Sequence, residues 1–218
     1  MRKLKTSPAD GGVFAFAPFL SPAETRDRIR GAEHIVVERL LKHHRQYGDW
    51  TGPFVVDIHR GIFGELFPDY AGRFRDASNN VMRFGSLDSI PAAQIDPRMQ
   101  QFIAAAQDGV KQFGAQQLTR KSILEIGDAA AMGHADLIEI HPFVDGNGRW
   151  ARAVTAAFIR DCGFAYGTVF VAARKREYVA ALDRAILKRE CGDLRRLIID
   201  GMRDQLKKRQ GYKLKGLR

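Results

Sequence analysis

Residues 141–152 read His-Pro-Phe-Val-Asp-Gly-Asn-Gly-Arg-Trp-Ala-Arg and separate two stretches with helical periodicity. Pro142 ends the first stretch at His141, because a residue that precedes proline disfavours the α conformation. Apolar residues recur at helical spacing before this point, at Ile123, Ile126, Ala130, Leu137 and Ile140, and after it, at Ala151, Val154, Thr155, Phe158 and Ile159. The second helix is predicted to end at Gly163. The chain must therefore fold around two helices joined by a short glycine-rich loop.

The loop has the composition of a phosphate-binding site. Gly146, Asn147 and Gly148 adopt positive φ at low cost, so their backbone N–H groups can converge on an anion. The dipole of the following helix adds to that attraction. Arg149 and Arg152 are three residues apart, which places them on one face near the start of the helix, within reach of the same polyphosphate.

Two further loop residues have side chains suited to phosphoryl chemistry. Asp145 is the carboxylate of the loop, and hard oxygen ligands beside phosphate are how Mg²⁺ is held, so we predict that it is a metal ligand. His141 can accept a proton from an attacking hydroxyl, which makes it the predicted general base. His59 is predicted to be structural, because nothing nearby in sequence supplies a partner. A metal pair of His134 and His141 lacks a third ligand at standard spacing, so His134 is predicted to be a packed histidine. Tyr178 can fill the core or line a nucleobase pocket.

This loop resembles the HPFx(D/E)GNGRxxR signature of Fic domains, position for position. The resemblance extends to residues 58–63 and 68–75, which look like the family's helix and its WAG-x-x-R turn, with Tyr70 where tryptophan is commoner. Residues 176–182 and 192–194 are similar to the family's closing helices. Together these segments cover roughly residues 53–202.

The resemblance implies an all-α fold of about seven or eight helices with one small β-hairpin. It divides the chain into an N-terminal extension and helix (1–52), a Fic core (53–203) and a basic C-terminal tail (204–218).

The resemblance also implies an activity: transfer of AMP from Mg-ATP to a Ser, Thr or Tyr hydroxyl of a target protein. In that family the motif histidine is the base, the acidic residue binds Mg²⁺, and the turn and two arginines hold the phosphates. Carried over, these are His141, Asp145, Gly146, Asn147, Gly148, Arg149 and Arg152. Three alternatives stay open: another nucleotide donor such as UTP, removal of AMP, and a catalytically silent nucleotide-binding module.

Residues 81–90 have short strand-like pieces around a Gly-Ser turn, which favours a hairpin. In Fic proteins a hairpin at this place, the flap, aligns the target's backbone by strand pairing. The resemblance therefore implies that the target binds at Val81, Met82, Arg83, Phe84, Gly85, Ser86 and Leu87.

Many Fic proteins are restrained by a helix with the motif Ser/Thr-x-x-x-Glu-Gly/Asn, whose glutamate pairs with the second motif arginine. The nearest string is Thr6-Ser7-Pro8-Ala9-Asp10-Gly11, which has aspartate in place of glutamate. We therefore expect that Arg152 is not blocked by this chain. Inhibition would then come from a separate small antitoxin-like protein, as in the toxin branch of the family.

Charge and hydropathy bear on whether the protein binds nucleic acid, spans a membrane or is exported. The net charge of +10 is compatible with nucleic-acid binding, but no reading motif accompanies it and much of the excess lies in residues 207–218. A tail of that composition is expected to be disordered. No apolar run is long enough for a membrane span, and the first residues do not resemble a signal peptide. We expect a soluble protein that is cytoplasmic or delivered into a host cell, with Cys162 and Cys191 as free thiols.

Local signals place the helix starts. Ser21 and Glu24 form a predicted capping box around Pro22, and Pro53 opens a second helix. Asp96-Pro97 marks the start of a third. Ser122 and Glu125 mark either the start of the helix that leads to His141 or a turn inside it.

Overall fold

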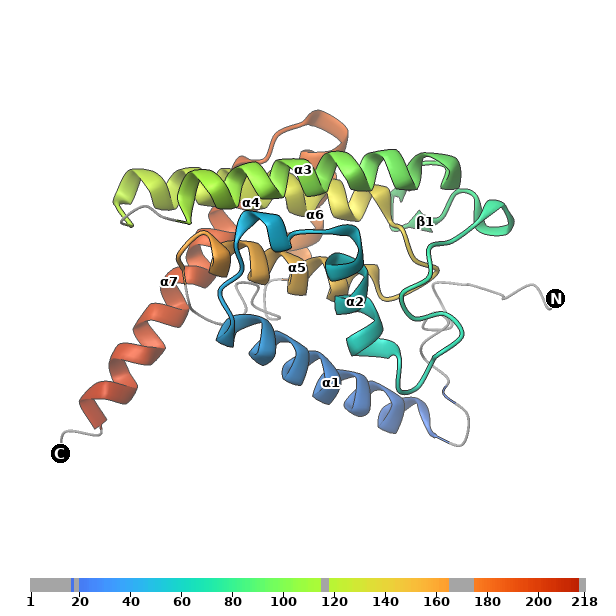
Figure 1. The fold of residues 1–218 in the computed structure, drawn as a ribbon, viewed down its shortest axis with the longest axis horizontal. Coiled ribbons are helices and arrows are strands. Elements are labelled where there is room, and N and C mark those ends of the chain that lie inside the picture. Colours follow the sequence, from blue (N-terminus) through green and yellow to red (C-terminus); the bar gives the residue numbers. More distant parts are fainter. Residues whose placement is uncertain (1–16, 18–19, 115–117, 165–174, 216–218) are drawn as a thin grey trace.

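The computed structural model describes residue 17 and residues 20–114, 118–164 and 175–215 (Figure 1). Within these ranges the fold is all-α with one two-stranded antiparallel hairpin, as predicted. The helices are α1 (Pro22–Lys42), α2 (Gly52–Phe63), α3 (Ile95–Phe113), α4 (Arg120–Ile140), α5 (Asn147–Asp161), α6 (Lys175–Lys188) and α7 (Gly192–Lys215). The strands are β1 (Arg83–Phe84) and β2 (Leu87–Asp88), and short 3₁₀ turns span Tyr47–Asp49, Ala77–Asn79 and Ala92–Gln94.

Helices α4 and α5 form the centre of the fold. Helix α4 contacts α3, α5, α6 and α7, whereas α5 also contacts α1 and α2, which lie on its other side (Figure 1). The fully buried side chains at this centre include Trp150, Phe143, Ile126, Leu137, Ile140, Ile159, Leu194 and Ile198. The loop between α4 and α5 is therefore held between two helices that the core fixes on all sides.

Most predicted helix starts are confirmed, with one shift of the cap. Ser21 accepts from Glu24 N–H and Glu24 accepts in return, so the capping box of α1 is present. Helix α4 is capped by Thr119, with Ser122 as its reciprocal partner, so Ser122 lies one turn inside the helix. Helix α3 begins at Ile95 after a 3₁₀ turn, so Asp96 is a first-turn residue and not the cap.

The predicted hairpin forms within residues 81–90, which we call the flap. Arg83 pairs with Asp88 and Phe84 with Leu87, and Gly85 has a φ of 63° at the turn. Leu87 is buried, which holds one side of the flap against the body.

Helix α7 corrects one expectation. Its backbone is helical to Lys215, so the prediction of a disordered tail is wrong for residues 207–215. Figure 1 shows this end of α7 projecting from the body.

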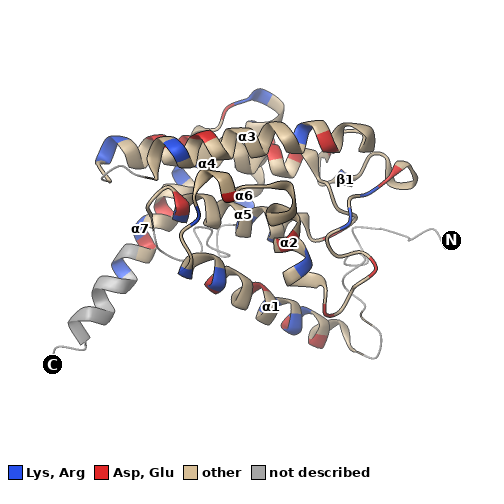
Figure 2. Ribbon diagram, viewed as in Figure 1, with Lys and Arg blue, Asp and Glu red and all other residues tan. Residues whose placement is uncertain are grey.

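Surface charge and helix hydropathy bear on two classes considered from the sequence, nucleic-acid-binding proteins and membrane-spanning proteins. Both signs of charge alternate along α1 (Figure 2), where Asp27 pairs with Arg30 and Glu38 with His34. In the described part of the chain, no helix combines the length and the apolar character that crossing a membrane requires. Cys162 and Cys191 are free thiols, as predicted.

Candidate active site

The loop from His141 to Asn147 is fastened to the core by its own side chains. Phe143 is fully buried, with its ring 3.7 Å from that of His59 in a stacked arrangement and edge-on to Trp150. The Asn147 side chain accepts from Phe143 N–H at 3.0 Å and donates to Phe143 O at 2.8 Å. Both ends of this amide thus serve the loop, while the backbone N–H of Asn147 starts α5 and can face an anion.

His59 supports the loop from α2. Its Nδ1 accepts from Gly72 N–H at 3.0 Å, so Nε2 carries the proton and donates to Asp145 O at 3.0 Å. Burial lowers the pKa of His59 to about 4, so the ring is neutral near pH 7. The predicted structural role is confirmed: His59 fixes the backbone of the loop.

Gly146 is the turn that sends the chain into α5. Its φ of 79° is left-handed, and a Cβ at this position would lie 2.5 Å from the Phe63 ring, so only glycine fits. Helix α5 starts at Asn147, and the N–H groups of its first turn have no carbonyl within the helix to accept them. This helix end is fully formed and suited to an anion.

His141 is the C-cap of α4, directly after its last residue Ile140, and has a left-handed backbone, with φ 48° and ψ 57°. Its Nδ1 lies 3.3 Å from Ile138 O. Since a carbonyl can only accept, Nδ1 carries the proton and the lone pair is on Nε2. This is the protonation that a general base requires.

The His141 ring is covered by the flap. Phe84 stacks on it, with the ring centroids 4.3 Å apart and the planes 7° from parallel. Burial lowers the pKa of His141 to about 4; the hydrogen bond to Ile138 opposes this shift and the nearby Arg75 cation adds to it. The imidazole is therefore neutral at physiological pH.

Arg149 and Arg152 meet at the start of α5, as predicted, and each pairs with Glu33 of α1. Glu33 Oε2 lies 3.6 Å from Arg149 Nε, and Oε1 lies 3.9 Å from Arg152 Nη2. Gly148 lies close to the same group, since a Cβ added there would be 3.5 Å from Arg152 Nη1. Arg152, which we expected not to be blocked by this chain, therefore has a carboxylate of α1 beside it.

Sequence reasoning missed Glu33 because its neighbours differ from the motif. Ile29 and His34 stand at the positions of Ser/Thr and Gly/Asn. Only the glutamate of the motif is present, and the sequence gives no other signal that α1 packs beside the loop. The string Thr6–Gly11 considered above lies outside the described residues.

Arg152 has a second neighbour on α6. Its side chain donates to the Tyr178 hydroxyl, and that hydroxyl lies 2.8 Å from His134 Nε2. On the far side, His134 Nδ1 is 2.9 Å from Thr155 Oγ1, which donates to Ala151 O. Because Thr155 uses its proton on that carbonyl, His134 donates from Nδ1 and accepts from Tyr178 at Nε2. Tyr178 and His134 therefore support Arg152.

Asp145 precedes Gly146, and its Oδ1 accepts a hydrogen bond from Gly146 N–H at 2.6 Å. Its negative charge also acts on Arg149, where it opposes the lowering of the pKa by burial. Within the described ranges, no cluster of three or more His, Cys, Asp or Glu could hold a metal alone. One carboxylate next to a phosphate site nevertheless fits Mg²⁺, which takes one or two carboxylates, phosphate oxygens and water.

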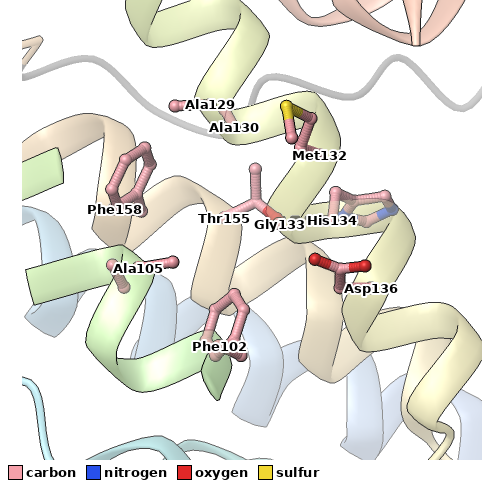
Figure 3. A pocket seen from close by; sticks show the side chains of 11 residues that line it. Phe102, Ala105, Ala129, Ala130, Met132, Gly133, His134, Asp136, Thr155 and Phe158 are labelled. Carbon is pink, nitrogen blue, oxygen red and sulfur yellow. Dashed lines mark hydrogen bonds between the residues drawn. The ribbon is translucent and has the colours of Figure 1, made fainter. Parts of the chain in front are cut away.

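A cavity of about 210 Å³ lies elsewhere, between α3, α4 and α5 (Figure 3). Its walls are mainly apolar, including Phe102, Met132 and Phe158, with His134 and Asp136 at its polar edge. None of the predicted site residues lines it. The candidate site is thus the surface formed by the loop, the start of α5 and the flap.

Comparisons with known proteins agree with this geometry. The model of the Fic/DOC family matches residues 50–159, which is 110 of 218 residues. The protein adenylyltransferase Fic of Nematostella vectensis is 33% identical over 111 residues, covering 50% of this chain and 23% of that protein. The protein adenylyltransferase fic-1 of Caenorhabditis elegans is 29% identical over 143 residues, covering 65% of this chain and 24% of that protein. The chain therefore spans about a quarter of the length of these curated relatives.

Solved structures show the same fold. BepC of Bartonella tribocorum, solved with bound AMPPNP, superposes with a TM-score of 0.66 at 19% identity, covering 83% of this chain and 87% of that one. Fic-1 of C. elegans gives a TM-score of 0.62 at 21% identity, covering 92% of this chain and 55% of that one.

Proposed function

This chain belongs to the Fic/DOC family, and from that premise we propose that it is a protein adenylyltransferase, which transfers AMP from Mg-ATP to a Ser, Thr or Tyr hydroxyl of a target protein. One observation carries the proposal: a neutral imidazole with a lone pair on Nε2 ends α4, and the same short loop leads into a helix N-terminus with two arginines.

In the proposed reaction the target's hydroxyl oxygen attacks the α-phosphorus of ATP. His141 Nε2 takes the hydroxyl proton, and the bond from the α-phosphorus to the bridging oxygen breaks, so pyrophosphate leaves with the electron pair. The N–H groups of the first turn of α5, together with Arg149 and Arg152, stabilise the phosphate charge. Asp145 would hold Mg²⁺, which neutralises charge on the phosphates.

The flap is proposed to hold the target. Its residues 81–87 would pair with an extended target segment and present the acceptor hydroxyl to His141. Phe84 must leave the His141 ring for this to happen, since the two rings are in contact.

Glu33 is proposed to restrain the enzyme. Its carboxylate occupies both arginines, and a phosphate group of ATP requires the same positive charge. Restraint by α1 replaces the separate inhibitor that the sequence suggested.

The test is incubation with Mg²⁺ and ATP labelled at the α-phosphate, with a cell lysate as the source of targets. Wild type, Glu33→Gly and His141→Ala are compared, and ATP labelled at the γ-phosphate serves as a control. A protein band labelled only from the α position, stronger with Glu33→Gly and absent with His141→Ala, is expected. Equal labelling by His141→Ala contradicts the proposed base. ATP binding without any labelled band contradicts AMP transfer and favours another nucleotide donor.

A further inference from the structure

Arg75, the last residue of the turn at residues 68–75, is a buried cation outside the loop of residues 141–152. It is only 4% exposed and lies between α2 and the flap. A guanidinium has five N–H donors, and here all five are used on carbonyl oxygens. Nε donates to His141 O at 2.7 Å, Nη1 to Asn79 O at 3.1 Å and to Asn80 O, and Nη2 to Ile90 O at 2.6 Å and to Ile140 O at 3.0 Å.

These carbonyls belong to two functional segments. Ile140 and His141 end α4, and the backbone N–H of Arg75 adds a bond to the next carbonyl, Pro142 O, at 2.8 Å. Three successive carbonyls around His141 are thereby satisfied by one residue, at a helix end that would otherwise leave them without partners. The other three carbonyls lie on both sides of the hairpin, at residues 79–80 just before the flap and at Ile90, the last residue of the flap.

We propose that Arg75 is a positioning residue that holds the flap and His141 in one rigid frame, so that a target segment on the flap is registered against the base. This inference rests on the proposed function. A direct bond from Ile90 N–H to Glu139 O at 3.2 Å joins the same two segments, but Arg75 supplies most of the contacts between them.

Geometry explains why arginine is used. The planar guanidinium of arginine holds its five N–H donors in fixed directions within one plane, whereas the ammonium of lysine has only three donors, which do not lie in a plane. Arg75→Lys therefore keeps the positive charge beside His141 but loses at least two of the five bonds. The left-handed backbone of His141, which is unfavourable for a residue with a Cβ, also depends on the bond from Arg75 Nε to its carbonyl.

The test compares Arg75→Lys with Arg73→Lys, a matched control on an exposed residue of the same turn. Hydrogen exchange, the affinity for Mg-ATP and AMP transfer are measured on the full chain. For Arg75→Lys we expect exchange about tenfold faster or more in residues 79–90 and 137–143 alone. The dissociation constant for Mg-ATP changes less than about threefold, and transfer at saturating ATP falls about tenfold to a hundredfold. Arg73→Lys changes none of these.

Two results overturn the inference: unchanged exchange in the flap, or a rise spread evenly over all helices, which marks ordinary destabilisation. Exchange does not depend on catalysis, so it decides the role of Arg75 even if the wild type transfers no AMP and the proposed function fails. If Arg75→Lys does not fold, NMR exchange on uniformly ¹⁵N-labelled wild-type protein gives a second measurement. The Arg75 Nε–H and the Ser89 N–H, which donates to Met82 O, should then exchange through the same opening. If the Ser89 N–H exchanges while the Arg75 Nε–H stays protected, the flap opens without releasing Arg75, and the inference is refuted.

Discussion

The ring of Phe84 lies parallel to that of His141, with 4.3 Å between their centroids. A flap residue thus covers the proposed base in the absence of a target. This contact is part of the burial of the imidazole, and burial is the main reason why the pKa of His141 falls to about 4.

Replacing Phe84 should therefore move the titration of His141. In Phe84→Ala, water reaches the imidazole, so its pKa rises from about 4 toward the ordinary 6.5. Because the base works only when neutral, the acid limb of the transfer rate shifts to higher pH by the same amount. An NMR titration of the His141 ring measures the shift without a target. Phe84→Leu, which keeps an apolar cover, should stay near the wild type, and an unmoved midpoint in Phe84→Ala would show that the flap does not control this pKa.

Removing the Glu33 carboxylate should tighten ATP binding. Glu33→Gln leaves the shape of α1 intact but frees Arg149 and Arg152, so we expect the dissociation constant for Mg-ATP to fall about tenfold. The ion pairs are long and about one-third exposed at the arginines, so stability should change by less than about 1 kcal/mol. Calorimetric titration with ATP measures the affinity. Glu38→Gln on the same helix is the control, and equal affinities of the two variants would exclude competition by Glu33.

Loss of the Tyr178 hydroxyl should weaken ATP binding. Tyr178→Phe removes the acceptor for Arg152 and the donor to His134, so Arg152 loses its fixed position and the dissociation constant rises several-fold. The effect should not vary from pH 5 to 9, because burial raises the pKa of Tyr178 to about 12 and lowers that of His134 to about 3. Tyr47→Phe, on an exposed tyrosine, is the control. A strongly pH-dependent defect would mean that the network titrates.

Two buried histidines should make the fold sensitive to acid. His59 and His134 have pKa values of about 4 and about 3, whereas the unfolded chain has about 6.5, so below pH 6.5 the unfolded state binds more protons. Stability is therefore full above pH 6.5 and falls as the pH drops toward 4, by about 1.4 kcal/mol per pH unit for each histidine. Urea unfolding at several pH values measures the slope. His134→Gln should reduce it and His44→Gln, on an exposed histidine, should not; a flat profile in the wild type contradicts the prediction.

Features encoded by neighbouring residues could be predicted from the sequence. The capping box of α1, the end of α4 at His141, the turn at Gly146 and the hairpin around Gly85 each depend on a few adjacent residues. The whole motif loop belongs to this group, which is why its candidate residues were found together.

Contacts between distant segments could not be predicted in the same way. His59 meets Asp145 across 86 residues, and Arg75 meets His141 across 66. Glu33 lies on a helix whose local sequence matches only one position of the expected inhibitory motif, so only the packing of α1 against α5 brings it to the arginines. Such partners are set by tertiary packing, and a pattern along the chain carries no record of them.

The ion pair between Glu33 and Arg152 also has a consequence for dosage. Under the proposed restraint, inhibitor and catalyst are one polypeptide, so each copy of the chain would carry one of each and a change in expression would not alter their ratio. The effective concentration of the carboxylate at the arginines is fixed by the fold. Activation under this proposal would then require Glu33 to leave the two arginines, through a bound ligand, a modification or a contact with another protein.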